Sequence, residues 1–326
     1  MIKANAYGHG LVAVAQALAA ADAFAVARIE EAVALRESGC TARIVLLEGF
    51  RDAAELDIAA HQGLEPFVHQ DEQLAMLEAW RGPQVLRAWL KIDTGMHRLG
   101  FAAGAAAAAI ARLRACRYVA QPFAVATHLA DAERADGIAT RAQVAAFSTA
   151  TTGFSGERSI ANSAGLIACP ETRSDWVRPG IMLYGISPFV GQTGTDHGLR
   201  PVMSFETRII ALKDLAAGDR VGYGGTWTAL RASRIAVAAV GYGDGYPRSA
   251  GNGTPVAVNG VAAAVAGRPS MDMLTIDVTG LPGVAVGDRV ELWGPQVPVE
   301  RVAAAAGTIA YELTCRVGRR VSFSAT

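Results

Sequence analysis

Cysteine is scarce in this 326-residue chain. The four cysteines, Cys40, Cys116, Cys169 and Cys315, stand far apart, so none belongs to a CxxC pair of the kind that binds a metal. So few thiols in a chain of this size are typical of a reduced, cytosolic protein rather than a disulfide-rich secreted one. The sequence therefore predicts a cytoplasmic location and no metal site.

Charge is also scarce, and it is balanced. Charged residues make up 18% of the chain, with 30 basic and 30 acidic residues. This balance argues against a nucleic-acid surface and against a polybasic membrane patch. No apolar run approaches the roughly 20 residues that a membrane-spanning helix needs. Hydrophobic residues nevertheless reach 51%, so we expect a sizeable core, two domains and a small-molecule partner.

The first part of the chain alternates short β-rich runs with helical patterns. The predicted strands are Met1–Ala4, Phe24–Ala27, Arg43–Glu48, Leu64–His69, Leu86–Asp93, Phe123–Leu129, Arg158–Asn162 and Trp176–Tyr184. Amphipathic stretches between them are Gly10–Ala21, Glu30–Ser38, Ala53–Gln62, Asp71–Trp80 and Ala102–Ala115. Repeated β–α units predict parallel strands with helical crossovers, and eight of them predict a closed (β/α)8 barrel of the TIM type.

A different pattern follows the barrel. The segment Gly185–Gly198 is rich in Gly, Pro, Ser and Thr, and it is the predicted linker. Beyond it, short apolar runs are separated by turns such as Asn259-Gly260, which is typical of an antiparallel β domain. The sequence thus predicts an α/β protein, with the barrel in residues 1–190 and a mainly antiparallel β domain in residues 191–326.

The first chemical signal is Lys3, in the segment KANAYGHG at the end of the first predicted strand. Barrel active sites lie at the carboxyl ends of the strands. A desolvated lysine loses its charge more easily and can then form a Schiff base with a carbonyl group. A lysine in an ordinary glycine loop is the alternative that this segment alone leaves open.

The second signal is a divided anion site. Ser163 follows the seventh predicted strand, and the segment Arg178-Pro179-Gly180-Ile181 lies in the eighth. Phosphate sites of such barrels are typically built after these two strands. The Ser163 hydroxyl and the backbone N–H groups of Gly180 and Ile181 can donate to a phosphate. A lysine and a phosphate site in one barrel mouth suggest pyridoxal phosphate (PLP), although two ordinary turns remain the alternative.

Further candidates follow the fifth and sixth strands. Lys91 and Arg98, in KIDTGMHR, bring two cations toward the barrel axis and would require an anion between them or a modified lysine. The alternative is that Lys91 points outward and pairs with a surface acid. His128 ends the sixth strand, where a supporting role is the expected one.

The β domain holds two tyrosine turns and one further tight segment. Tyr223 and Tyr242 are flanked by glycines, which expose the tyrosine and let another surface come close. Arg268 and Met271 lie in the segment GRPSMDM. Taken alone, the two tyrosine turns are more typical of ordinary packing within a β domain, and the GRPSMDM segment is compatible with either interpretation.

Together these segments resemble the alanine racemase family, whose members are fold-type III PLP enzymes. The segments that carry the resemblance, in chain order, are KANAYGHG, KIDTGMHRLG, ATHLADAE, ANSAG, VRPGIMLYG, VGYGGTW, VGYGDGYPR, GRPSMDM and AYEL. The resemblance implies a cytoplasmic, homodimeric isomerase that interconverts L-alanine and D-alanine and supplies D-alanine for peptidoglycan. It implies that Lys3 binds PLP covalently and transfers the proton on one face of the substrate. Tyr223, from the second subunit, would be the base on the other face.

The resemblance also implies roles for the remaining candidates. These are the phosphate contacts Tyr7, Ser163, Gly180, Ile181 and Tyr311; Arg178 at the pyridine nitrogen; His128 behind Tyr223; Arg98 and Met271 at the substrate carboxylate; Lys91 as a possible carbamylated residue; and Tyr242 and Arg268 in the channel through which the substrate enters.

Two other functions stay open at this point. One is an amino-acid decarboxylase of the same architecture, and the other is an inactive, truncated PLP-binding remnant. Family members begin with a β-strand and a helix before the lysine strand, whereas this sequence starts at Met1 within that strand. The resemblance therefore raises the expectation of an N-terminally shortened barrel. The choice among alanine, serine and other small amino acids is not determined by these motifs.

Overall fold

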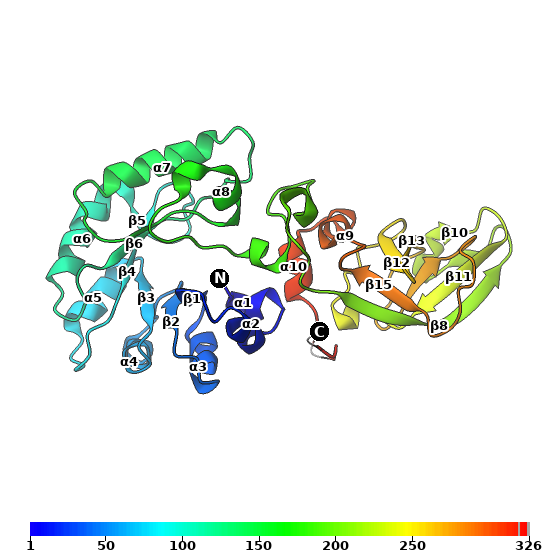
Figure 1. The fold of residues 1–326 in the computed structure, drawn as a ribbon, viewed down its shortest axis with the longest axis horizontal. Helices are drawn as coiled ribbons and strands as arrows, with labels where there is room; N and C mark the ends of the chain where they lie inside the picture. Colours follow the sequence, from blue (N-terminus) through cyan, green and yellow to red (C-terminus); the bar gives the residue numbers. More distant parts are fainter. Residues whose placement is uncertain (319, 325–326) are drawn as a thin grey trace. The chain divides into compact units, whose positions relative to one another are not determined.

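The computed structural model describes residues 1–318 and 320–324 and contains two compact units, Met1–Gly180 and Ile181–Thr326 (Figure 1). The sequence analysis places the boundary after residue 190, whereas the boundary between the two compact units follows Gly180. The segment predicted as a linker, Gly185–Gly198, belongs to the second unit and contains a 3₁₀ turn, η4 (Gly194–His197). The side chain of Asp196 caps this turn by accepting hydrogen bonds from the N–H and hydroxyl groups of Thr193.

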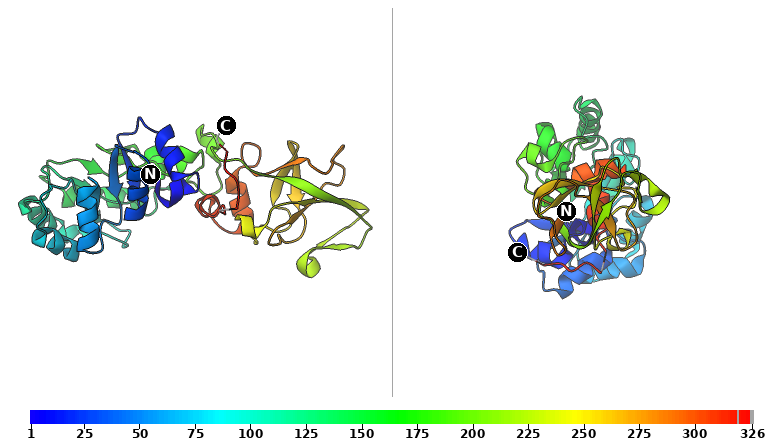
Figure 2. Two further views of the ribbon diagram at one scale, coloured as in Figure 1. Left: turned by 90° about the horizontal axis from the view of Figure 1, so that it is seen from below. Right: turned by 90° about the vertical axis from the view of Figure 1, so that its right-hand side faces the viewer.

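The first unit is a curved parallel sheet with helices on its outer side (Figure 1, Figure 2). Its strands are β1 (Ala23–Val26), β2 (Arg43–Leu46), β3 (Glu65–Val68), β4 (Trp89–Asp93), β6 (Ala124–Ala126) and β7 (Arg158–Ser159), in this spatial order, with β5 (Phe101–Ala102) beside β4. Its main helices are α2 (Leu11–Ala17), α3 (Ile29–Glu37), α4 (Ala53–His61), α5 (Asp71–Ala79), α6 (Ala106–Ala115), α7 (Ile138–Ala150) and α8 (Ser163–Ala168). The predicted β–α alternation is confirmed.

Two short extended segments continue the sheet between β7 and β1. The hydrogen bonds that do so are Arg178 N–H to the Ala161 carbonyl (3.0 Å), the Met1 amino group to the Pro179 carbonyl (3.1 Å), and Ile2 N–H to the Ala25 carbonyl (3.0 Å). With these segments in place of the first and eighth predicted strands, the order of the TIM-type barrel is present. Both segments are shorter than the predicted strands. The strand predicted at Trp176–Tyr184 is shortened because its last four residues form a 3₁₀ helix, η3 (Ile181–Tyr184).

The strand predicted at Met1–Ala4 is wrong beyond Ile2. From Ala4 to Tyr7, the residues of α1 (Lys3–Tyr7) have φ between 53° and 54°, so the chain makes a left-handed turn that ends at Gly8. This conformation costs L-residues about 1–2 kcal/mol each, so surrounding contacts must hold it. The Asn5 side chain accepts a hydrogen bond from Leu11 N–H (2.9 Å), and Tyr7 is buried.

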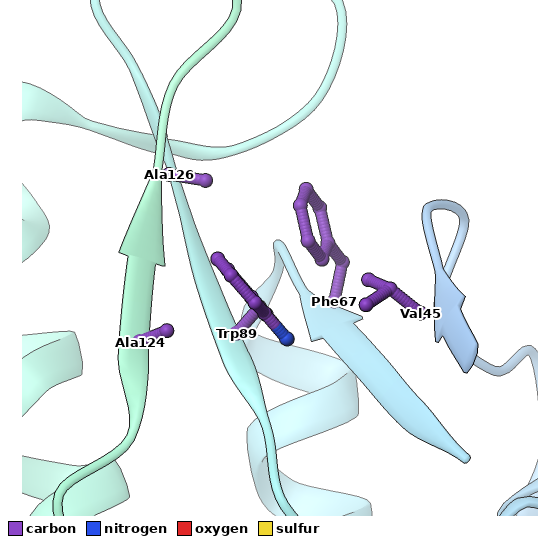
Figure 3. Packing of buried hydrophobic residues seen from close by; sticks show 5 residues of the cluster. All are labelled: Val45, Phe67, Trp89, Ala124 and Ala126. Carbon is purple, nitrogen blue, oxygen red and sulfur yellow. The ribbon is translucent and has the colours of Figure 1, made fainter. Parts of the chain in front are cut away.

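The barrel interior contains a layer of apolar side chains from alternate strand positions (Figure 3). They are Val45, Phe67, Trp89, Ala124 and Ala126. The ring centroids of Phe67 and Trp89 are 5.8 Å apart, and Trp176 meets Trp89 edge-on at 5.7 Å. Because strand side chains alternate between faces, the residue two positions after each member of this layer points toward the carboxyl-end mouth of the barrel.

The second unit is the predicted antiparallel β domain. Six of its strands form a closed barrel in the order β11 (Ser233–Ala238), β14 (Leu274–Asp277), β13 (Val261–Val265), β12 (Pro255–Val258), β15 (Arg289–Trp293) and β8 (Phe205–Leu215). A separate hairpin pairs β9 (Arg220–Val221) with β10 (Trp227–Thr228), and the helices are α9 (Val299–Ala306) and α10 (Ala310–Cys315). Closure gives each barrel strand two partners and leaves no barrel edge exposed.

Gly49, at the turn after β2, provides a test of how tightly the mouth of the first barrel is packed. A Cβ atom there would lie 2.1 Å from the Phe67 carbonyl oxygen and 2.6 Å from Gln73 Nε2, at a φ of +70°. We expect Gly49→Ala to lower the free energy of unfolding by about 2–4 kcal/mol, from the left-handed backbone and the overlap together. Gly63→Ala is the matched control, because Gly63 has a φ of +59° but no atom within 4 Å of the added Cβ.

The control should lose about 1 kcal/mol, from the backbone alone. Urea unfolding of both variants measures the difference. Equal losses would show that the turn relaxes without cost and that the mouth is not close-packed there.

Candidate active site

A cavity of about 490 Å³ opens at the mouth of the first barrel. Five of the sequence-predicted residues line it: Lys3, Lys91, Arg98, His128 and Arg178. These residues are far apart in the sequence, but each lies at or just beyond the carboxyl end of a strand. The structure thus brings together four cationic side chains and one imidazole.

Lys91 lies on the inner face of β4, two residues after Trp89. It is 9% exposed, and its Nζ is 6.0 Å from the centre of the Phe67 ring. Burial, followed by the charges of Arg178 and Arg98, lowers the pKa of Lys91 to about 7. The alternative that Lys91 points outward to a surface acid is therefore wrong.

Arg178 is held by four hydrogen bonds at the back of the cavity. It donates to the Thr127 carbonyl (2.6 Å), the Ser159 hydroxyl (2.6 Å), the Ile160 carbonyl (3.2 Å) and His128 Nδ1 (3.3 Å). Burial lowers the pKa of Arg178 to about 10, so the guanidinium keeps its charge at neutral pH.

The contact between Arg178 and His128 fixes the state of the imidazole. Burial, and then the Arg178 charge, lowers the pKa of His128 to about 2, so the ring is neutral at physiological pH. A guanidinium can only donate, so Nδ1 must accept and Nε2 must carry the proton. His128 therefore offers an N–H donor at Nε2.

A second feature of this unit is a narrow polar cradle made by Tyr7, Ser163 and Gly180. The Gly180 N–H donates to the Ser163 hydroxyl oxygen at 2.8 Å. A Cβ atom on Gly180 would lie 2.6 Å from the Tyr7 hydroxyl, so only glycine lets this hydroxyl lie so close to the backbone. Ser163 is positioned at the start of α8, where the Asn162 side chain caps the helix by accepting from Gly165 N–H at 2.9 Å.

In the second unit, Tyr223 stands on a short glycine turn, η5 (Tyr223–Gly225), and is 69% exposed. Gly222 and Gly224 have φ values of 70° and 74°, which L side chains rarely adopt. Arg220 holds the turn by donating to the carbonyls of Gly225 (2.9 Å) and Gly224 (3.2 Å). The phenol is thus presented outward on a braced turn.

The segments with Arg268, Met271 and Tyr242 lie next to one another in this unit. A Cβ atom on Gly222 would lie 3.8 Å from the Arg268 backbone, which places Arg268 beside the Tyr223 turn. The Tyr242 N–H donates to the Ser270 carbonyl at 3.0 Å, and the next N–H donates to the Met271 carbonyl at 2.8 Å. Tyr242 and Met271 are both exposed.

The last two predicted residues lie elsewhere in the second unit. Ile181 is fully buried in η3, and Tyr311 lines a separate groove of about 460 Å³ between residues 187–196 and the helices α9 and α10.

The sequence analysis missed other residues of the cavity in the first unit. Leu47, Glu48, Arg51, Phe67 and His69 also line it. The signal for His69 and Leu47 was the strand register, because each lies two residues after an inward-facing apolar residue, Phe67 or Val45. Among residues 1–318 and 320–324, no group of three or more His, Cys, Asp or Glu side chains is arranged to hold a metal ion. Within the same described part, no helix is long and apolar enough to cross a membrane.

Two family models match the chain. The model for the N-terminal domain of alanine racemase matches residues 1–188, and the model for the C-terminal domain of alanine racemase matches residues 202–324. Curated alanine racemases from Azoarcus sp. (strain BH72) and Aeromonas hydrophila are 52% and 50% identical to the chain. Each alignment covers 98% of this chain and 90% of the relative.

Solved structures agree with these matches. The biosynthetic alanine racemase from Pseudomonas aeruginosa has a TM-score of 0.94 at 44% identity, covering 98% of this chain and 89% of that one. The alanine racemase from Bartonella henselae with covalently bound pyridoxal phosphate has a TM-score of 0.86 at 32% identity, with the same coverage. The fold, these matches and the cationic barrel mouth agree, and the chain belongs to the alanine racemase family of PLP-dependent enzymes.

Proposed function

We propose that this protein interconverts L-alanine and D-alanine by a two-base, PLP-dependent mechanism, with Lys3 and Tyr223 as the two bases. The observation that carries the proposal is the single barrel-mouth cavity that gathers Lys3, Lys91, Arg98, His128 and Arg178. Family membership makes alanine the substrate to test first. The product D-alanine would supply peptidoglycan synthesis.

The residues of the first unit fit an anionic cofactor. PLP carries a phosphate and an ionised phenolic oxygen, and the cavity is lined by Lys3, Lys91, Arg98 and Arg178. The cradle of Tyr7, Ser163 and Gly180 supplies hydroxyl and N–H groups of the type that bind phosphate, and the glycine lets the Tyr7 hydroxyl come close to the backbone. We assign the phosphate to this cradle, with Ile181 and Tyr311 as the further contacts that the family resemblance implies.

When bound, PLP draws electrons from the substrate Cα and so makes its proton removable. Racemisation then needs one proton relay on each face of Cα. Lys3 Nζ holds the cofactor and transfers the proton on one face, and the Tyr223 hydroxyl transfers it on the other. In this proposal, Nε2 is the atom of His128 that would donate to the Tyr223 oxygen, since Nδ1 already accepts from Arg178.

Arg178 also bears on the electronics of the ring. In our proposal it faces the pyridine nitrogen of the cofactor. A guanidinium that is still charged at neutral pH cannot accept a proton and offers only N–H donors to the ring. With Arg178 as its partner the ring nitrogen would stay unprotonated, which would weaken electron withdrawal and favour reprotonation at Cα over side reactions.

The substrate carboxylate is assigned to Arg98 and to the backbone N–H of Met271. Arg98 lines the cavity of the first unit, and Met271 is exposed on the second unit. Tyr242 and Arg268 lie beside the Met271 and Tyr223 segments, and we assign them to the channel through which the substrate enters.

We propose a homodimer in which Tyr223 serves the site of the partner subunit. Three features of the second unit support this: the 69% exposure of Tyr223, the bracing of its turn by Arg220, and the exposed neighbours Tyr242 and Met271. An exposed aromatic side chain on a rigid turn is typical of a surface that completes a partner's site. We also place the enzyme in the cytoplasm, consistent with the free thiols Cys40, Cys116 and Cys169.

The first test is the racemase assay with variants of the two bases. We expect the parent protein to form D-alanine from L-alanine and the reverse. Lys3→Ala should abolish the visible absorbance of covalently bound cofactor. Tyr223→Phe should keep that absorbance but lose about 10²–10⁴-fold in turnover, most severely from L-alanine. Carbon dioxide release in place of D-alanine would instead favour a decarboxylase, and bound cofactor without any turnover would favour an inactive PLP-binding protein.

The second test is subunit complementation. If Tyr223 acts on the partner's site, mixing Lys3→Ala with Tyr223→Phe and exchanging subunits creates heterodimers with one intact site. Random exchange should then restore about a quarter of the parental activity, since half of the dimers carry one active site of two. Each variant alone, carried through the same exchange, is the control. No recovery in a mixture shown to contain heterodimers would place both bases in one chain.

The third test concerns Lys91, which we propose is carbamylated. The neutral amine attacks carbon dioxide, forms a carbamate and releases a proton, so the cation becomes an anion between Arg98 and Arg178. With the pKa of Lys91 lowered to about 7, the neutral amine, and hence the carbamate at fixed dissolved carbon dioxide, increases as pH rises through 7.

Protein equilibrated with ¹³C-labelled carbon dioxide should show a carbamate NMR signal that follows this pH dependence. Lys91→Arg keeps a positive charge but cannot form the carbamate, so it should lack the signal. A signal that persists in Lys91→Arg would assign the modification to another amine, and no signal in the parent would refute it.

A further inference from the structure

A buried glutamine on helix α7 joins two loops of the cavity. Gln143 is 4% exposed. Its Nε2 donates to the His128 carbonyl at 3.0 Å and to Thr94 Oγ1 at 3.3 Å, and its Oε1 accepts from Ala130 N–H at 2.8 Å. The orientation of the amide is fixed by these partners, because only oxygen can accept from an N–H and only the NH₂ group can donate to a carbonyl.

The two loops that Gln143 joins follow β4 and β6. The loop after β4 leads from Asp93 to Arg98, and the loop after β6 begins with Thr127 and His128. A second link lies beside the first, because the hydroxyls of Thr94 and Thr127 are 2.7 Å apart and Thr127 is buried. Gln143 therefore acts between residues that the proposed function assigns to the substrate carboxylate and to the support of Tyr223.

The loop after β4 is stiff enough to transmit this constraint. The Asp93 carboxylate accepts from the N–H groups of Gly95 (3.0 Å), Met96 (3.1 Å) and His97 (3.0 Å). Gly95 also packs on the side chain of Gln143, since a Cβ there would lie 3.4 Å from Gln143 Cγ. A loop closed by three hydrogen bonds and anchored at Thr94 fixes the position at which the backbone reaches Arg98.

A second buried glutamine links another pair of loops around the cavity. Gln73, on α5, is 1% exposed. Its Oε1 accepts from His69 N–H at 2.8 Å, and its Nε2 donates to the carbonyls of Phe50 (2.9 Å) and Glu48 (3.4 Å). Gln73 thus joins the loops after β2 and β3 with the same number of bonds. These loops also line the cavity, through Glu48 and His69, but they carry none of the residues assigned above to the substrate carboxylate or to Tyr223, so Gln73 is a control with equal burial and bonding.

We propose that Gln143 is a positioning residue of the racemase site, which holds the Arg98 loop and the His128 loop in one fixed geometry through a single carboxamide. This inference rests on the proposed function. Removing the amide takes away the partner of the part-buried His128 carbonyl and of the Ala130 N–H, so we expect water to enter and the loops to separate. Small displacements of positioning groups reduce catalysis strongly even when the chemical groups are retained.

The test compares Gln143→Leu with Gln73→Leu in the holoenzyme. Both variants lose three hydrogen bonds at a buried site, so both should lower the melting temperature by similar amounts. Only Gln143→Leu should reduce kcat/KM for alanine, by about 10²-fold. Displacement of Arg98 should raise KM, and displacement of His128 should lower kcat in the direction from L-alanine. Gln143→Glu keeps the shape and the acceptor for Ala130, and it should lie between the parent and Gln143→Leu.

Hydrogen exchange provides a readout that is independent of activity. Amides of residues 94–100 and of Ala130 should exchange faster in Gln143→Leu, whereas the residue 48–51 segment and His69 should respond only in Gln73→Leu. If Gln143→Leu does not fold, the same comparison of Gln143→Glu with Gln73→Glu decides the question.

Equal losses of activity in the two leucine variants, or unchanged loop exchange in Gln143→Leu, would overturn the positioning role. Failure of the proposed function would look different, because the parent protein itself would then fail to racemise alanine while the exchange pattern could still be measured.

Discussion

The site depends on the concentration of like charge over an apolar floor. Lys3, Lys91, Arg98 and Arg178 share one barrel mouth, and the aromatic layer of Phe67, Trp89 and Trp176 lies in the interior beneath it. Burial lowers the pKa values of Lys91, His128 and Arg178, and the charges of the neighbouring cations lower those of Lys91 and His128 further. An anion relieves the repulsion among these charges, so the cavity favours a phosphorylated, phenolate-bearing cofactor and a carboxylate substrate.

The two units contribute different kinds of residue, and the difference follows from their folds. A parallel barrel converges its strand ends on one mouth, so it can gather Lys3, Lys91 and His128 from distant parts of the chain. The antiparallel barrel has its side chains committed to a closed core, and it offers exposed turns instead. Tyr223 stands on such a turn, braced by Arg220 and made possible by the left-handed Gly222 and Gly224. In our proposal, the exposed phenol on this rigid turn is the base that completes the site of a second subunit.

The hydrophobic periodicity and the order of the motifs predicted the strand–helix alternation, the antiparallel second domain and the gathering of five site residues. Local energetics could not be predicted in the same way. The strand expected at Met1–Ala4 ends at Ile2, because tertiary contacts hold four consecutive residues in a left-handed turn that no propensity scale favours. The direction of Lys91 was undecidable from its own segment, and it became fixed once Trp89 was known to face inward. Gln143 was missed because an isolated glutamine on a helix usually faces solvent. The available signal was its place on a stripe with Thr140 and Phe147, where both neighbours are buried.

The state of His128 connects the fold to the stereochemical demand of the reaction. A racemase must work equally well from either enantiomer, so each base must be able to start protonated or deprotonated without another group in the site taking its proton. An imidazole with an ordinary pKa would compete for that proton at neutral pH. Here burial and Arg178 hold the pKa of His128 near 2, so the ring remains a neutral donor through both directions. Arg178 itself is tied to Thr127, Ser159 and Ile160, and Gln143 fixes the His128 backbone from the opposite side. In our proposal, the neutral His128 therefore does not take the proton that Lys3 and Tyr223 exchange with the substrate.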